Sequence, residues 1–178
     1  MNDKTYLPTP PRRVAFLGLG VMGYPMAGHL CMATLHANSA NQALDRIINF
    51  FPEERRAQLL MDLSLNLKGL VSQRLMPRQE GRGRVAAVEI MLNTPLISDL
   101  IFKGEVAEIK EIMKRSRELG MQTFDQALFD LYEGQAITFE DALRNADSVN
   151  DLRLQIKLHS QRARSSDLSA GTEHLTIV

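Results

Sequence analysis

The sequence predicts a mixed α/β fold with few strands and a mainly helical C-terminal part. Three observations support this prediction. An apolar run at 13–17 leads directly into a glycine-rich loop, as a buried strand does when it enters a tight turn. Two further runs with strand composition flank the segment 77–84, which contains two glycines. After residue 94, capping residues and helical spacing recur up to the last twenty residues, so this part should be helical.

Length and composition exclude several classes of protein. The 178 residues suit one domain or one domain with a tail, and not a two-domain enzyme of usual size. Lys plus Arg and Asp plus Glu each number 21, so the basic excess of a nucleic-acid binder is absent. The single cysteine, Cys31, excludes an intramolecular disulfide framework. No run approaches the roughly 18–20 apolar residues of a membrane span, so we expect a cytoplasmic protein without one.

The first elements are a leader, a strand and a glycine loop. Residues 1–12 are polar and rich in proline, which predicts an extended, mobile leader. The strand at 13–17 is followed by Gly18, Gly20 and Gly23 in the pattern G-x-G-x-x-G. In a dinucleotide site the first glycine permits the turn, the second lets the backbone approach the pyrophosphate, and the third lets strand and helix pack closely. These three glycines are therefore candidate cofactor-binding residues.

Two helices and a hairpin should follow. The apolar run 29–35 suits a strand, Ser39 is placed to cap a helix over 40–49, and Pro52 should start a long helix. The expected buried stripe of the long helix is Leu60, Leu63, Leu67, Leu70 and Val71. The hairpin strands are expected at 71–76 and 85–92. Alternation along the second strand predicts one buried face made of Ala86, Val88, Ile90 and Leu92.

The remaining elements are helices with recognisable ends. Their expected spans are 94–104, 105–119, 123–134, a helix opened by Thr138, and 148–159. From Ser160 onward the chain is rich in arginine, serine and glycine without periodicity, which predicts a disordered tail over 160–178.

The opening segment carries one resemblance. Residues 14–30 read V-A-F-L-G-L-G-V-M-G-Y-P-M-A-G-H-L, and residues 13–30 resemble the NAD(P)-binding start of the β-hydroxyacid (3-hydroxyisobutyrate) dehydrogenases. Such a site also needs an acidic residue, or an Asn-Arg pair, on a second strand about 20 residues further on. The corresponding window, 38–46, instead has the pattern of a helix cap and helix. The family's later catalytic lysine has no match.

A second resemblance covers most of the chain. The run H-L-C-M-A-T-L-H-A-N at 29–38 resembles the His box of the secretion and pilus ATPases, and F-P-E-E at 51–54 continues the match. Further matching segments are 67–75, 89–95, L-G-M-Q-T-F-D at 119–125 and the closing 146–153. Together they are similar to the type IV pilus twitching-motility and retraction ATPases of the PilT/PilU type, over about residues 29–158. The closing segment favours the PilU type.

This resemblance implies a fold and a set of roles. Residues 29–95 would be the C-terminal part of a truncated RecA-like P-loop ATPase core, and 96–159 its helical C-terminal subdomain. His36 of the His box would face the nucleotide and sense the γ-phosphate, with Thr34, Asn38 and Arg46 nearby. The segment 94–105 would couple nucleotide state to subunit movement. The resemblance also implies ATP with Mg²⁺ as ligand, a hexameric motor of identical or full-length pilus ATPase subunits, and pilus machinery at the cytoplasmic face of the inner membrane.

The parts that would perform hydrolysis are not found in the sequence. It contains no G-x-x-x-x-G-K-[ST] and no Gly-Lys dipeptide, so it has no Walker A loop to hold the phosphates. The family's Walker B acids would lie upstream of His29. We therefore predict no catalytic residue and no metal ligands, and expect no ATP hydrolysis by this chain alone.

The two resemblances meet at 28–30, where Gly-His-Leu fits both patterns. This coincidence suggests a chimera, either a genomic recombinant or an assembly artefact. Two other functions stay open at this point: a remnant of an NAD(P)-binding oxidoreductase, and a helical interaction module without a ligand. Parallel titration with ATP and NADPH would separate the three.

Overall fold

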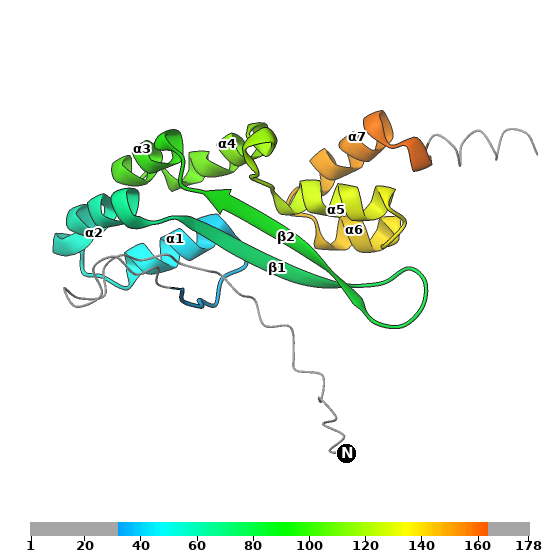
Figure 1. Ribbon diagram of the computed structural model, residues 1–178, viewed down its shortest axis with the longest axis horizontal. Helices are drawn as coiled ribbons and strands as arrows, with labels where there is room; N and C mark the ends of the chain where they lie inside the picture. The colour runs from blue at the N-terminus through cyan, green and yellow to red at the C-terminus, as the bar shows by residue number, and fades with distance from the viewer. Residues whose placement is uncertain (1–31, 164–178) are drawn as a thin grey trace, which may run out of the picture. The chain divides into compact units, whose positions relative to one another are not determined.

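The computed structural model describes residues 32–163, and the mixed α/β fold predicted from the sequence is confirmed (Figure 1). The leader, the strand at 13–17 and the glycine loop lie outside the described residues. The first elements are α1 (Ala40–Asn49), α2 (Glu53–Asn66) and a hairpin of β1 (Gly69–Pro77) and β2 (Arg84–Leu92). The helical elements that follow are α3 (Pro95–Lys103), η2 (Val106–Glu108), α4 (Ile109–Arg115), η3 (Arg117–Leu119), α5 (Phe124–Glu133), α6 (Phe139–Asn145) and α7 (Val149–His159).

Capping side chains set the helix starts, as predicted. The Ser39 hydroxyl accepts a hydrogen bond from the Gln42 amide, because the first turn of a helix has amides without intrahelical acceptors. Thr94, Thr138 and Ser148 cap α3, α6 and α7 in the same way. Gly104 ends α3 with a φ of 76°, in the left-handed region that favours glycine.

The strand predicted at 29–35 is wrong for its described part. Residues 32–37 have no regular secondary structure. A strand needs a neighbour to satisfy its backbone amides and carbonyls. Within residues 32–163 the sheet consists of β1 and β2, which pair with each other, so this segment has no strand partner there.

The predicted stripe of the long helix is wrong at its far end. α2 stops at Asn66, and Leu70 lies on β1. The Asn93 side-chain amide, which follows β2, donates to the carbonyl oxygens of Ser64 (2.9 Å) and Leu67 (2.8 Å). These bonds satisfy carbonyls at the helix end, where intrahelical donors run out.

The buried face of β2 is the opposite of the predicted one. Ala87, Glu89 and Met91 are buried, whereas Leu92 is 36% exposed and the other three residues of the predicted face are half-buried. Because side chains alternate along a strand, the position of Glu89 decides which face is inside. Its carboxylate is only 2% exposed and accepts a hydrogen bond from the Ala40 amide.

The helix predicted over 105–119 is divided into η2, α4 and η3. Ser116 leaves the helical region with φ −112° and ψ 35°, and this ends α4. Val106, Ile109 and Met113 on these elements are buried.

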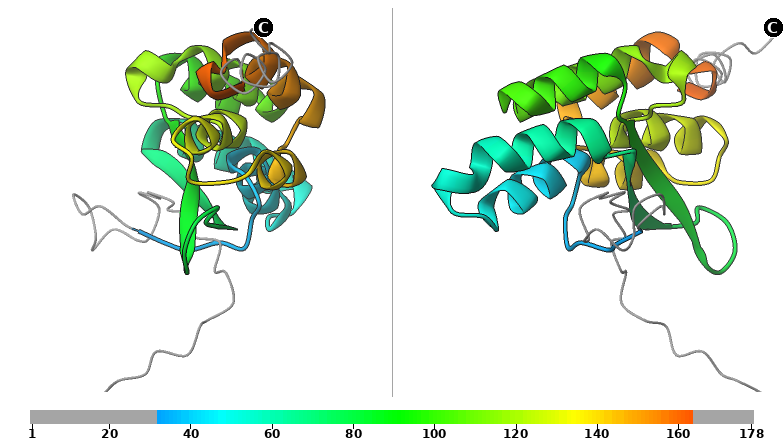
Figure 2. Two further views of the ribbon diagram at one scale, coloured as in Figure 1. Left: turned by 90° about the vertical axis from the view of Figure 1, so that its right-hand side faces the viewer. Right: turned by 60° about the vertical axis from the view of Figure 1, so that its left-hand side comes forward.

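The chain forms two compact units, each with its own core. The first consists of residues 32–75 and 88–123, so the domain boundary expected at residue 95 falls inside it. α2 and α3 lie side by side in this unit (Figure 2). Its largest fully buried side chains are Leu44, Leu63, Leu67, Leu70, Met91, Ile97, Ile101, Ile109, Met113 and Met121.

The second unit consists of residues 76–87 and 124–163, with α5, α6 and α7 packed on one another. Its core includes Phe124, Leu128, Ile137, Ala142 and Leu152. The predicted disordered tail differs at its start: Ser160 is fully buried and donates to the Glu133 carboxylate, so residues 160–163 belong to this unit. The rest of the tail lies outside the described residues.

Within residues 32–163, no helix is long and apolar enough to cross a membrane.

Candidate functional site

Three of the four predicted nucleotide-sensing residues lie on one short segment, residues 32–39, directly before α1. Thr34, His36 and Asn38 are exposed, while Ala37 is 3% exposed and belongs to the core of the first unit. Over residues 34–38, exposed side chains alternate with less exposed ones, as in extended backbone, where successive side chains leave on opposite sides. The segment therefore presents a hydroxyl, an imidazole and a carboxamide to solvent while a small side chain anchors it.

The end of this segment is fixed by hydrogen bonds to α1 and to β1, and the adjoining first residue of α1 is hydrogen-bonded to β2. The backbone N–H of Asn38 donates to Gln42 Oε1 (2.6 Å), and the backbone carbonyl of Asn38 accepts from Arg74 Nη2 (3.1 Å). Two residues later, the Ala40 amide donates to Glu89 Oε2 (2.7 Å). Arg74 is on β1 and Glu89 is on β2, so the start of α1 is held from both strands.

Arg46, the fourth predicted residue, lies on α1 and is exposed. The buried side of that helix is made of Ala40, Ala43, Leu44 and Ile47. Within residues 32–163, no hydrogen bond or ion pair joins the Arg46 side chain to Thr34, His36 or Asn38. Three of the predicted residues therefore share one segment, and Arg46 lies on the helix that follows it.

Sequence reasoning missed Arg74 and Glu89. One signal was available for the second of them: Glu89 is the lone charged residue in the apolar run 85–92. A carboxylate within such a run is buried only where donors satisfy it, and so marks a specific contact. The predicted cofactor-binding residues Gly18, Gly20 and Gly23 lie outside the described residues.

The segment 94–105, which the resemblance assigned to coupling, contains α3. Its buried residues Ile97, Leu100 and Ile101 belong to the core of the first unit. Ser98 Oγ donates to the Ser64 carbonyl on α2 (2.7 Å), which joins the two helices by a polar contact. At the exposed end, Lys103 donates to Asp99 (2.7 Å), and this bond with the carboxylate charge raises the pKa of Lys103.

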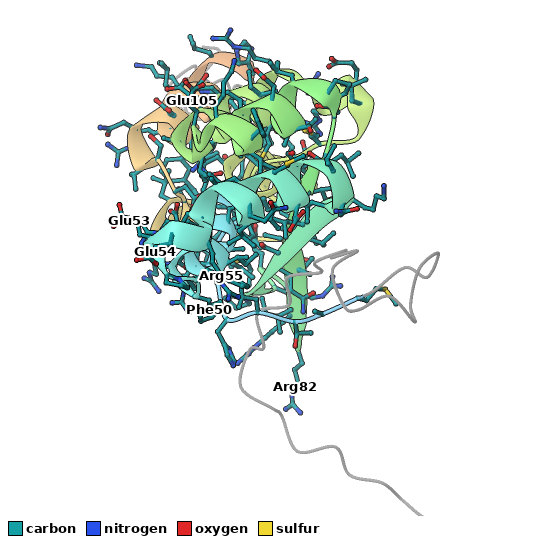
Figure 3. All side chains as sticks on the ribbon, turned by 90° about the vertical axis from the view of Figure 1, so that its left-hand side faces the viewer. Phe50, Glu53, Glu54, Arg55, Arg82 and Glu105 are labelled. Atoms are coloured by element: carbon teal, nitrogen blue, oxygen red, sulfur yellow. The ribbon has the colours of Figure 1, made fainter. Side chains whose placement is uncertain are left out.

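Other exposed side chains gather at the connection between α1 and α2. Phe50 is 69% exposed, and Glu53, Glu54 and Arg55 at the start of α2 are exposed as well (Figure 3). The two glutamates lie in the first turn of α2, where negative charge is favoured by the helix dipole. The stability of α2 therefore explains the position of these two glutamates.

In the described part of the chain, no group of three or more His, Cys, Asp or Glu side chains is arranged to hold a metal ion.

Comparison with known proteins defines the class. Residues 24–144 match the family described as type II/IV secretion system protein. This match covers more than half of the 178 residues, so the chain belongs to that family. The prediction of a pilus and secretion ATPase relative is therefore confirmed at the level of the family.

Individual relatives are more specific. The chain is 59% identical to the type IV pilus ATPase PilU of Pseudomonas aeruginosa over 156 residues, which cover 88% of the chain and 41% of the relative. It is 40% identical over 119 residues to the type IV pilus retraction ATPase PilT of the same organism, covering 67% of the chain and 34% of the relative. The chain thus spans less than half of either relative.

Solved structures agree with the fold class. The crystal structure of the pilus retraction motor PilT with bound ADP matches with a TM-score of 0.63 and 34% identity, over 70% of this chain and 34% of that one. The Legionella pneumophila ATPase DotB matches with a TM-score of 0.51 at 20% identity, over 61% of this chain and 29% of that one, which shows the fold alone. The predicted RecA-like α/β class is confirmed.

Proposed function

We propose that this chain supplies the nucleotide-sensing part of a type IV pilus retraction ATPase and does not hydrolyse ATP by itself. The observation that carries the proposal is the exposed His36 segment, whose backbone is held from α1 and from β1 and adjoins a helix start held from β2. A fixed backbone with exposed donor side chains suits recognition of a phosphate group. The sequence contains no loop that could hold the β- and γ-phosphates for transfer.

The proposed roles follow from the side chains. His36 offers a ring N–H to a phosphate oxygen, and Thr34 and Asn38 offer a hydroxyl and an amide N–H on the same exposed segment. Arg46, exposed on α1, would contribute a guanidinium. Among residues 32–163, no group of three or more His, Cys, Asp or Glu side chains is arranged to hold a metal ion. No step is therefore assigned to the metal here.

The proposed partners are full-length subunits of a pilus ATPase, or further copies of this chain, at the cytoplasmic face of the inner membrane. Support comes from the high identity to PilU over 88% of this chain, together with the 41% of PilU that it covers. In a mixed oligomer, residues 32–163 would contribute the sensing segment.

Titration of the purified chain into a full-length pilus ATPase tests this proposal. We expect ATP turnover to fall as the ratio of chain to full-length subunit rises, since mixed oligomers would contain inactive members. Sedimentation should show that the His36→Ala chain enters the oligomer as well as the unchanged chain does. The fall in ATP turnover that it causes should nevertheless differ in size from the fall caused by the unchanged chain. Unchanged turnover at every ratio, with the chain sedimenting alone, would contradict the proposal.

The relatives named above are ATPases and none of those named is a dehydrogenase, so the NAD(P) alternative gains no support. We also propose that the chain is a chimera of a dehydrogenase-like start and a pilus ATPase part. The family match begins at residue 24, inside the dehydrogenase-like segment 13–30 and before the shared Gly-His-Leu. Amplification across codons 20–40 from source DNA tests the hypothesis, and a continuous native product would exclude an artefact.

A further inference from the structure

We infer that Glu89 and Arg74 are positioning residues for the His36 segment, and that residues 88–90 of β2 connect this segment to Gln122. The inference rests on the proposed function for its meaning in nucleotide sensing. The contacts themselves belong to the first unit of the structure and are independent of any ligand.

Glu89 is a buried acidic residue whose carboxylate accepts a hydrogen bond from the start of α1. Its neighbours on the buried face, Ala87 and Met91, are fully buried, and Glu89 itself is 2% exposed. A carboxylate in such surroundings is strongly disfavoured unless donors satisfy it. Its Oε2 accepts from the Ala40 amide (2.7 Å), which is in the first turn of α1 and at the positive end of the helix dipole. The buried charge therefore fixes the start of this helix.

Arg74 completes the attachment from the other strand. Its guanidinium donates to the Asn38 carbonyl (3.1 Å), so residues 38 and 40 are each held by a charged side chain. Ser39, between them, caps α1. His36 lies two residues before the first of these contacts, and its distance from the hairpin is thereby restricted. Without these contacts, α1 and the buried side chain of Ala37 would still hold the segment, but neither would tie it to the hairpin by a charged side chain.

The same stretch of β2 also holds a segment much later in the chain. The backbone of Ile90 pairs with that of Gln122 through two hydrogen bonds (2.8 and 2.9 Å), and Gln122 Nε2 donates to the Val88 carbonyl (2.9 Å). Residues 88–90 thus contact the first residue of α1, next to the His36 segment, through the Glu89 side chain, and contact Gln122 through the backbone of Val88 and Ile90. The chain enters its second unit directly after Thr123. A displacement at the start of α1 should reach Gln122 through these bonds.

The first test needs no nucleotide. Backbone amide hydrogen exchange is measured in the full chain and in Glu89→Gln, a variant with nearly the same shape and no charge. We expect the Ala40 amide to exchange about tenfold faster or more, as loss of a charge-assisted hydrogen bond permits. The matched control is Glu111→Gln, which changes an exposed ion pair (3.8 Å) on α4 and should leave Ala40 unchanged. Unchanged exchange at Ala40 in Glu89→Gln would overturn the inference.

Arg74→Gln is a second variant at a half-buried position, where folding is less at risk. It should accelerate exchange of amides 38–40 without affecting α5. If Glu89→Gln fails to fold, the result with Arg74→Gln decides: faster exchange at 38–40 supports the inference, and unchanged exchange overturns it.

The second test adds MgATP and follows the His36 ring by NMR. In the unchanged chain His36 and the Gln122 amide should both shift on titration, and in Glu89→Gln the apparent affinity should fall about tenfold. If His36 does not respond in the unchanged chain, the proposed function fails, while the exchange data still test positioning. If His36 responds and Glu89→Gln binds MgATP as the unchanged chain does, positioning is overturned.

Discussion

The Arg162 side chain fastens the end of the described chain to the second unit. Nη1 donates to the carbonyls of Tyr132 (2.7 Å) and Ile137 (3.2 Å), and Nη2 donates to Gln79 Oε1 (2.6 Å). The guanidinium carbon also lies 4.4 Å from the centroid of the Tyr132 ring, within the range of a cation–π contact. One planar group thus joins α5, the following loop and the hairpin turn.

We predict that Arg162→Ala destabilises the second unit by about 2 kcal/mol, because it leaves carbonyls without their donor and removes the contact with Tyr132. Arg162→Lys should recover only part of this loss, since an ammonium lacks the planar fork. Urea unfolding followed by tyrosine fluorescence, to which Tyr132 contributes, measures the change. Arg153→Ala, at an exposed position on α7, is the control and should stay within about 0.5 kcal/mol. Equal effects of the two alanine variants would contradict the assignment.

Ser39 carries a second prediction at this scale. Its hydroxyl accepts from the Gln42 amide, so Ser39→Ala should lower the free energy of unfolding by about 1 kcal/mol. Asparagine is an equally good cap, and Ser39→Asn should retain most of the stability. Chemical denaturation of the unchanged chain, Ser39→Ala and Ser39→Asn measures the free energy of unfolding of each. If Ser39→Asn loses as much stability as Ser39→Ala, the lost cap is not the cause of the destabilisation.

Individual residues also show what sequence reasoning can reach. The caps Ser39, Thr94 and Thr138 were predicted correctly, because a cap and the amide it binds are three residues apart. Glu89 was missed because its partner, Ala40, is 49 residues away in sequence. The candidate residues Thr34, His36 and Asn38 share one exposed segment, but their roles came from resemblance and remain proposals.

At the scale of elements, the base of the hairpin depends on Gly69. A Cβ atom added there would lie 2.7 Å from the Met91 carbonyl oxygen, closer than van der Waals contact allows. Because that neighbour is backbone, relief requires the two strands to separate.

We predict that Gly69→Ala destabilises the first unit by about 1–3 kcal/mol, the usual cost of an overpacked site. Arg82→Ala, at an exposed position of the hairpin turn, is the control and should stay within about 0.5 kcal/mol. Amide exchange along β1 and β2 gives the measurement. Little change in Gly69→Ala would mean that the strands are less closely spaced than described.

Helices and strands could be predicted where the residues that determine them are close together in the sequence. Both hairpin strands and the starts of α3, α6 and α7 agree with the patterns of apolar and capping residues. The strand predicted at 29–35 failed because strand formation depends on a neighbouring strand, and local composition does not supply one. The predicted face of β2 failed because both faces are largely apolar, and the contact between Glu89 and Ala40 selects the buried one.

At the scale of the whole chain, the two units have separate cores. Leu44 belongs to the core of the first unit and Leu128 to that of the second, and each is fully buried. Either leucine changed to alanine should cost about 3 kcal/mol, since a cavity is left behind. We predict that amide protection falls mainly in the unit that carries the substitution. Equal loss of protection in both units for both variants would mean that the chain unfolds as one cooperative unit.

The central claim is that this chain contains a nucleotide-sensing segment but no means of hydrolysis on its own. Phosphate release from MgATP by the purified full chain, with His36→Ala as the comparison, tests it most directly. The account predicts no release above the rate in buffer for either protein, while the His36 ring resonance responds to MgATP in the unchanged chain. Mg²⁺-dependent turnover that His36→Ala abolishes would contradict it.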